Sequence, residues 1–149
     1  MLNTSNIKQY RISLHKSQNE VADILKVSRS SYAMWESNNE LFPIKRLIDF
    51  CELFSVSVDY IFNLCLENNY RLQKYNKDKS MLRLKEFRKE NKLTQEKLAS
   101  ILNTNKSVIC GYEKGRYIIA TPFLYQICKK YNISADYLLG KIDSHKYLN

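Results

Sequence analysis

The feature that most constrains this chain is that it repeats itself. When the sequence is shifted by 77 residues, residues 7–63 align with residues 84–140 without a gap. Thirteen aligned positions are identical, and most other pairs keep their chemical type. The identical pairs include Gln18/Gln95, Ala22/Ala99, Glu36/Glu113, Cys51/Cys128 and Asp59-Tyr60/Asp136-Tyr137. Because this period is longer than that of solenoid repeats, the sequence predicts a duplicated small domain.

The repeat changes the domain organisation that length alone would suggest. A chain of 149 residues is ordinarily one domain, but here we expect two modules, residues 1–63 and 81–149, joined by a partly helical connector at residues 64–80. Each module has roughly 60 residues, a size that folds alone around a small core. With 44% hydrophobic residues, three glycines and two prolines, the composition favours an all-α globular fold.

The distribution of charge differs between the two modules. The net charge of +9 divides into 0 for residues 1–63, +2 for residues 64–80 and +7 for residues 81–149. A basic module suits a polyanionic partner, although the same charges also suit a solvated surface. No apolar run approaches the roughly 18–20 residues of a membrane span, and no signal-peptide core is present. We therefore expect a soluble, cytoplasmic protein with no membrane partner.

The residue types that carry metal or catalytic chemistry form no recognisable group. None of the four cysteines belongs to a C-x-x-C pair, and neither His15 nor His145 lies near a cysteine at a metal-ligand spacing. Cys51 and Cys128 share one repeat position on an apolar helix face, which favours buried, reduced thiols over a metal or disulfide role. We expect no metal, no cofactor, no small-molecule ligand and no enzymatic activity.

Apolar spacing and turn residues predict five helices in each module. In the second module they fall at about residues 84–92, 95–102, 106–113, 121–131 and 135–139, and in the first at about 6–15, 18–25, 29–36, 44–54 and after Ser57. Ser17, Ser28, Thr94 and Ser134 are expected N-caps. Thr94 lacks the acidic partner of a capping box, because Lys97 stands at that place. Gly115 suits the positive φ of a helix end.

Two stretches of each module resemble a known family. Residues 93–115, LTQEKLASILNTNKSVICGYEKG, resemble the helix-turn-helix of the Cro/phage-repressor-like (Xre-type) family, and NISADYLLG and SVSVDYIFN resemble its closing signature. The resemblance implies two tandem five-helix lambda-repressor-like helix-turn-helix domains. The first copy has Asn38 where the second has Gly115, which leaves open how its third helix ends.

The resemblance also implies how the helices are held. Ala22 and Ala99 fall where two helices are expected to cross closely, although a small residue can also serve ordinary packing. Arg11/Glu36 and Arg88/Glu113 have the same separation of 25 residues. In this family such an arginine on the first helix pairs with the glutamate that ends the third. The alternative is two independent surface charges.

Base contacts in the family come from the third helix, which lies in the major groove. The expected base-contacting residues are Asn105, Lys106, Ser107, Cys110 and Gly111 in the second copy and Ser28, Arg29, Ser30, Ala33 and Met34 in the first. Expected phosphate contacts are Thr94, Gln95, Lys114, Arg116, Ser17 and Gln18. Lys106 and Arg29 suit guanine and phosphate equally well. The two glutamines suit either a phosphate or a solvated first helical turn.

The expected function is sequence-specific binding of double-stranded DNA by a transcriptional regulator, a repressor by family resemblance. The alternative is that the neutral first copy is a protein-interaction or dimerisation module of an antitoxin or accessory regulator. In that case only the second copy binds DNA. Two assemblies on DNA remain open, a homodimer and an intramolecular pseudo-dimer of the two copies.

Overall fold

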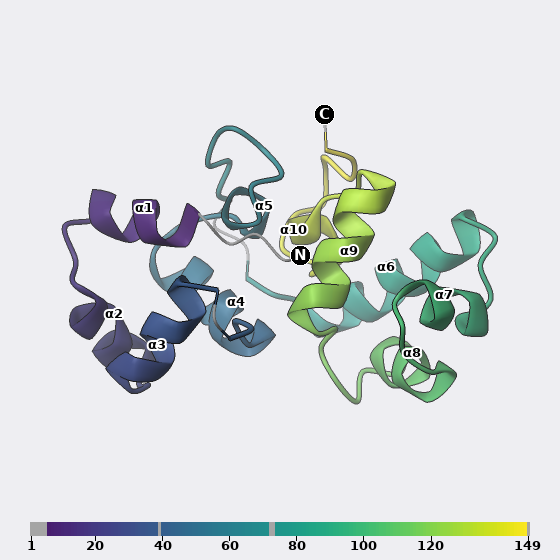
Figure 1. Cartoon of the computed structure of the whole chain (residues 1–149). Coiled ribbons are helices and arrows are strands. Elements are labelled where there is room, and N and C mark those ends of the chain that lie inside the picture. Colours follow the sequence, from purple (N-terminus) through teal and green to yellow (C-terminus); the bar gives the residue numbers. More distant parts are fainter. Residues whose placement is uncertain (1–5, 39, 72–73, 149) are drawn as a thin grey trace. The chain divides into compact units, whose positions relative to one another are not determined.

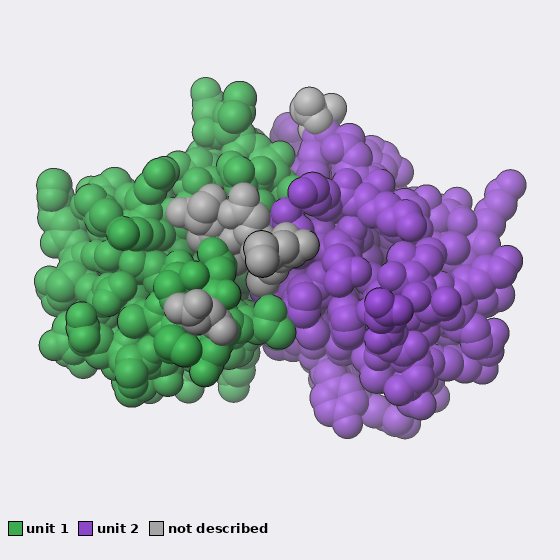
Figure 2. Space-filling view, in the orientation of Figure 1, with its two compact units in different colours: residues 1–72 green, residues 73–149 purple. Residues whose placement is uncertain are grey.

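The chain folds into two compact units of helices. The computed structural model describes residues 6–38, 40–71 and 74–148, and its two units comprise Met1–Leu72 and Gln73–Asn149 (Figures 1 and 2). In the described residues all regular elements are helices, and the sole β-type pairing is an isolated bridge between Ile133 and Tyr147. The predicted all-α fold is confirmed.

Each unit has the same order of five helices. Unit 1 contains α1 (Asn6–Ser13), α2 (Gln18–Leu25), α3 (Arg29–Glu36), α4 (Ile44–Leu53) and α5 (Val58–Ile61). Unit 2 contains α6 (Lys77–Glu90), α7 (Gln95–Ile101), α8 (Lys106–Glu113), α9 (Thr121–Tyr131) and α10 (Ala135–Leu138). The five helices of unit 2 thus correspond one by one to those of unit 1, as the repeat predicts.

The first helix of unit 2 starts earlier than the sequence suggested. The apolar spacing placed its beginning near Leu84, but α6 begins at Lys77 and includes residues 77–80, which we had assigned to the connector. The reason is a polar cap that apolar periodicity does not reveal. The side chain of Asn76 accepts a hydrogen bond from the Lys79 amide (3.0 Å), which satisfies a free N–H at the helix start.

Side-chain caps also fix the beginnings of α2, α3, α7 and α10. Ser17, Ser28, Thr94 and Ser134 each accept a hydrogen bond from the backbone amide three residues later. Ser17 and Glu20 form a complete capping box, whereas Thr94 caps α7 without one because position 97 is lysine. The expected caps are confirmed.

The same backbone turns recur in both units. Asn38 and Gly115 take positive φ values of 63° and 74°, so asparagine ends α3 with the left-handed turn that glycine makes after α8. Four further repeat pairs share this conformation: His15/Lys92, Lys26/Asn103, Ser55/Asn132 and Asn63/Gly140. The sequence predicted that the first helix ends near His15, but α1 ends at Ser13, because His15 has a left-handed backbone conformation. The duplication therefore preserves the path of the chain around every helix.

The two cores fill this shared backbone with different side chains. In unit 1, Phe42 contacts Tyr32, Trp35 and Phe50, with ring centroids 6.4, 5.0 and 6.2 Å apart. The repeat partners of Tyr32, Phe42 and Phe50 are three isoleucines, all buried in unit 2: Ile109, Ile119 and Ile127. Cys51 and Cys128 are both fully buried, as predicted.

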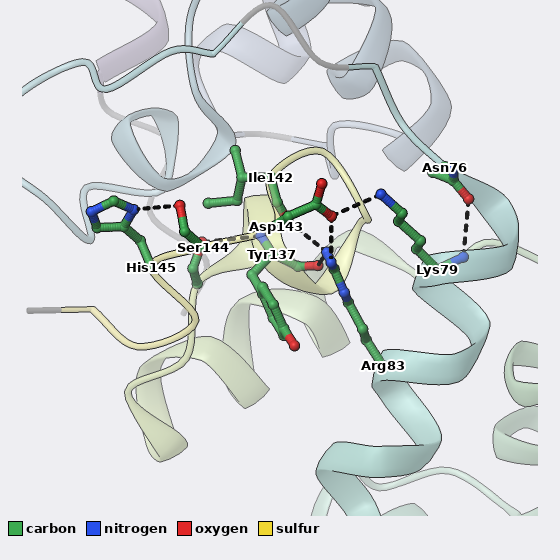
Figure 3. A network of polar contacts seen from close by, with 9 residues as sticks. Asn76, Lys79, Arg83, Tyr137, Ile142, Asp143, Ser144 and His145 are labelled. Atoms are coloured by element: carbon green, nitrogen blue, oxygen red, sulfur yellow. Dashed lines mark hydrogen bonds and ion pairs between the residues drawn. The ribbon is translucent and has the colours of Figure 1, made fainter.

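The last segment of unit 2 folds back onto α6 through a polar network (Figure 3). Arg83 donates to the carbonyl oxygens of Tyr137 and Ile142 (2.8 and 2.6 Å), and both Arg83 and Lys79 bind the Asp143 carboxylate at 2.8 Å. The two cations hold the pKa of Asp143 below its usual range. In unit 1, Asn6 at the repeat position of Arg83 donates to the equivalent carbonyl, that of Tyr60 (2.7 Å).

Gly140 provides a test of this docking. Its φ of +72° disfavours any side chain, and a Cβ there would lie 2.7 Å from the Asn76 carbonyl oxygen. We expect Gly140→Ala to destabilise unit 2 by about 1–2 kcal/mol or more, measured by hydrogen exchange at unit 2 amides. The matched variant Asn63→Gly keeps the left-handed turn of unit 1 and should change its stability by less than about 0.5 kcal/mol. A neutral Gly140→Ala would contradict this account.

Candidate nucleic-acid interface

A close helix pair forms the centre of each unit. Helix α2 packs against α3 in unit 1, and α7 packs against α8 in unit 2. Ala22 and Ala99, which we expected at a tight crossing, are buried on the first helix of each pair. A larger side chain at either position would have to displace close-packed neighbours. The two helix pairs therefore have the arrangement that a helix-turn-helix requires.

An ion pair, buried in unit 1 and partly buried in unit 2, joins the first helix of each unit to the end of the third. In unit 1, Arg11 Nε and Nη2 each lie 2.8 Å from a Glu36 carboxylate oxygen. In unit 2, Arg88 Nε and Nη2 lie 2.7 and 3.0 Å from the Glu113 oxygens. Both pairs are thus bidentate, the geometry in which arginine and carboxylate bind most strongly.

The same arginines also hold the turn before the second helix. Arg11 Nη1 donates to the carbonyl oxygen of Lys16 (2.8 Å), and Arg88 Nη1 donates to that of Leu93 (2.9 Å). Each guanidinium therefore contacts three segments: its own helix, the turn before the second helix and the end of the third helix. This orients the third helix relative to the rest of the unit.

Gln18 and Gln95 take part in this cluster, although we did not predict from the sequence that they would bind the glutamates. The side-chain amide of Gln18 donates to Glu36 Oε1 (3.2 Å), and that of Gln95 donates to Glu113 Oε1 (3.2 Å). The side chains are therefore not simply solvated, one of the two alternatives that the sequence left open. A signal was available: each glutamine precedes its glutamate by 18 residues in both copies.

In unit 1 the cluster favours the charged form of Glu36. Burial by itself opposes ionisation of Glu36, but hydrogen bonds from Arg11 and Gln18 outweigh it and hold the Glu36 pKa below its usual range. The Arg11 pKa is raised, chiefly by its hydrogen bond to Glu36. Both partners are charged near neutral pH, so the bidentate geometry persists under those conditions.

Apart from Gly111, the expected base-contacting residues of unit 2 lie at the start of α8 or are at least partly exposed on it. Asn105 is the N-cap, and its Oδ1 accepts from the Val108 amide (3.2 Å). Lys106 and Ser107 are exposed, and Cys110 is half-buried. Lys106 Nζ lies 3.2 Å from Glu96 Oε1, but both side chains are more than half exposed, so this pair contributes little stability. The Lys106 ammonium is available to a ligand.

The equivalent surface of unit 1 contains more hydroxyl groups. Ser28 caps α3, and its Oγ lies 2.9 Å from Ser31 Oγ and 3.3 Å from Ser30 Oγ. Arg29, Ser30 and Met34 are exposed and Ala33 is half-buried. Arg29 is the one cation among the five expected base-contacting residues of this unit.

Gly111 differs from what the helical pattern predicted. We expected it on the exposed outer face of α8, but it is buried and offers no surface to a base. The physical reason is the Tyr117 ring, which comes from the loop after α8 and lies against the glycine. Periodicity within a helix cannot reveal a residue that covers the helix from a loop.

The expected phosphate-contacting residues lie at the start of the second helix in each unit and, in unit 2, also directly after α8. Ser17 and Thr94 cap the second helices, and their side-chain oxygens already accept backbone hydrogen bonds. Lys114 and Arg116 follow α8 directly, and both are exposed. The cationic side chains of this set therefore belong to unit 2.

The described residues contain no group of three or more histidine, cysteine, aspartate or glutamate side chains arranged to hold a metal ion. Over the same residues, no helix combines the length and the apolar character needed to cross a bilayer.

The Glu36 cluster predicts a pH dependence of unit 1. Because the folded state lowers the Glu36 pKa, the ionised form stabilises the unit above the unfolded value of about 4.3. That stability is lost as pH falls through the folded pKa. The chain has one tryptophan, Trp35, so its fluorescence follows unit 1 during denaturation. We expect Glu36→Gln to lower stability at neutral pH by about 1–3 kcal/mol and to weaken the acid dependence.

Glu113→Gln is the matched control, since it alters the same cluster in the unit that has no tryptophan. It should leave the Trp35 transition in place. An unchanged acid dependence in Glu36→Gln would contradict the assignment.

Comparison with known proteins agrees with this geometry. Residues 4–67 and 82–144 each match a family profile described as a helix-turn-helix domain. A segment of 64 residues is 38% identical to the HTH-type transcriptional regulator ImmR of Bacillus subtilis (strain 168), covering 43% of this chain and 50% of that relative. No solved structure matches the chain. Because the profile covers both units over most of the sequence, the protein belongs to the helix-turn-helix family and carries two tandem copies of its domain.

Proposed function

We propose that the chain binds double-stranded DNA through α8, and to a lesser degree through α3, and acts as a transcriptional regulator, specifically a repressor. The observation that carries this proposal is the exposed, capped start of each third helix, which an Arg–Glu–Gln cluster holds in the same orientation in both units. Such a helix fits the major groove, where its first residues meet base edges. The printed name of the relative, a transcriptional regulator, supports the proposal.

Charge supports a larger role for unit 2. Within the helix-turn-helix itself, residues 17–40 carry two basic and four acidic residues, whereas residues 94–117 carry four basic and two acidic residues. The net charges are therefore −2 and +2. Since phosphate neutralisation supplies much of the affinity of a DNA-binding protein, unit 2 is the main DNA-binding unit in this proposal.

A salt titration of full-length variants tests the phosphate contacts. Lys114→Ala and Arg116→Ala should each reduce the slope of log affinity against log salt by about 0.9, because each removes one phosphate contact. Lys130→Ala removes another exposed charge, on α9 and outside the proposed interface, and is the matched control. An equal loss of slope in all three variants would show that only net charge matters.

Lys106 at the start of α8 and Arg29 at the start of α3 are tested separately. If Lys106 contacts a base, Lys106→Ala should cost about 1–3 kcal/mol on the preferred duplex and weaken the preference at one position. Arg29→Ala should cost less binding free energy, because unit 1 contributes less to DNA affinity in this proposal. Competition binding against duplexes with single base changes measures both effects. A uniform loss over all duplexes would place Lys106 on phosphate instead.

Unit 1 also supports a second candidate function, that of a protein-interaction or dimerisation module in an antitoxin or accessory regulator. Six of the nine exposed large hydrophobic side chains in the described residues belong to unit 1: Ile12, Ile24, Met34, Leu41, Leu53 and Leu66. Apolar exposure combined with a negative helix-turn-helix suits a protein partner better than DNA. This candidate requires that Arg29→Ala leave DNA affinity unchanged. The stoichiometry of the complex by light scattering separates a homodimer from a single-chain pseudo-dimer.

A further inference from the structure

The glycine in the middle of α8 is explained by the aromatic ring that covers it. A Cβ on Gly111 would lie 2.9 Å from Tyr117 Cδ2 and 3.2 Å from Tyr117 Cε2. Gly111 is not among the residues with positive φ, so its backbone does not require glycine. A glycine inside a helix costs about 0.5–1 kcal/mol relative to alanine. Glycine at position 111 therefore allows the Tyr117 ring to lie close to α8.

Unit 1 fills the same edge of its third helix in another way. Met34 stands at the repeat position of Gly111 and is 38% exposed, so α3 carries an apolar side chain of its own there. Glu40 stands at the position of Tyr117. Both units therefore present an apolar group beside the outer face of the third helix, but in unit 2 the loop supplies it.

The surroundings of the Tyr117 ring indicate its ligand. The side chain is 67% exposed although one edge rests on α8. Lys114 and Arg116, the exposed cations after α8, both precede it within three residues, and Ser107 lies one turn before Gly111 on the helix. An exposed apolar ring inside a cationic, hydrogen-bonding surface matches the major groove of DNA, where the thymine methyl is the apolar feature that distinguishes a base pair.

We propose that Tyr117 is a specificity-determining residue of unit 2, whose ring contacts the 5-methyl group of a thymine next to the bases that α8 faces. This inference rests on the proposed DNA binding and adds a contact from outside the recognition helix. Gly111 acts as a positioning residue, because its lack of a side chain allows the ring to reach the helix surface.

The test uses the full-length chain and a preferred duplex selected from a randomised DNA pool. Each thymine of that duplex is replaced in turn by deoxyuridine, which removes only the methyl group. For the wild-type chain we expect one position at which affinity falls about fourfold, the equivalent of one buried methyl group. Tyr117→Ala should weaken binding of the preferred duplex about fivefold or more. In this variant, deoxyuridine at that position should no longer lower the affinity.

Two further variants separate the ring from the hydroxyl and from general damage. Tyr117→Phe keeps the ring and should retain the uridine effect. Tyr147→Ala removes another exposed tyrosine of unit 2, 58% exposed, and should leave the uridine profile unchanged.

Gly111→Ala gives a readout in which affinity and stability change in opposite directions. Alanine favours the helix, so the melting temperature should stay the same or rise, yet the added Cβ displaces the ring and affinity should fall severalfold. In a Tyr117→Ala background, Gly111→Ala should no longer affect affinity. Equal effects of Gly111→Ala in both backgrounds would overturn the positioning role.

The outcomes also separate this inference from the proposed function. A preferred duplex with no uridine-sensitive thymine, or with one that stays sensitive in Tyr117→Ala, overturns the thymine contact and leaves DNA binding intact. If Tyr117→Phe loses as much affinity as Tyr117→Ala, the hydroxyl contacts phosphate and the proposal is again wrong. A chain that selects no duplex at all overturns both proposals.

Discussion

The bidentate ion pair between the first and third helices determines how each third helix is presented. In both units one guanidinium binds the glutamate that ends the third helix and the carbonyl oxygen of the turn before the second helix. The glutamine at the start of the second helix binds the same carboxylate. Because burying charges costs about as much free energy as pairing them returns, the cluster contributes orientation more than stability. Three helices are thereby fixed relative to one another in a unit whose core is small.

Comparison of the two copies shows which constraints the duplication has retained. The left-handed turns recur at five repeat positions, and the caps of the second, third and fifth helices recur as serine, threonine or asparagine. The shapes of core side chains have changed between the copies: three buried aromatic residues of unit 1 are isoleucines in unit 2. A hydrophobic core tolerates changes of shape if its volume is redistributed. The positive φ is kept at all five repeat positions although the residue differs in every pair, so at these turns the backbone conformation has been retained rather than the side chain.

The same distinction explains what the sequence could predict. Caps, turns and the Arg–Glu spacing are local or repeated signals, so the helices, their order and both ion pairs could be inferred before any coordinates were known. The start of α6 depends on the Asn76 cap, which apolar spacing does not reveal, and the docking of the last segment depends on contacts of Arg83 with the distant residues Ile142 and Asp143. They also lie outside the aligned repeat, where one copy cannot inform the other. The predicted exposure of Gly111 was wrong because the Tyr117 ring, which comes from the loop after α8, covers this glycine.

Fusing two copies in one chain removes a constraint that acts on symmetric dimers. In a homodimer every substitution on the recognition surface appears twice, so both half-sites change together. Here Arg29 and Lys106, or Met34 and Gly111, could diverge separately while the cluster that orients each third helix stayed the same. The net charges of −2 and +2 on the two helix-turn-helix segments show how far this divergence has gone. A retained scaffold with two unlike surfaces is suited to an asymmetric target, whether that target is two different half-sites or DNA together with a protein.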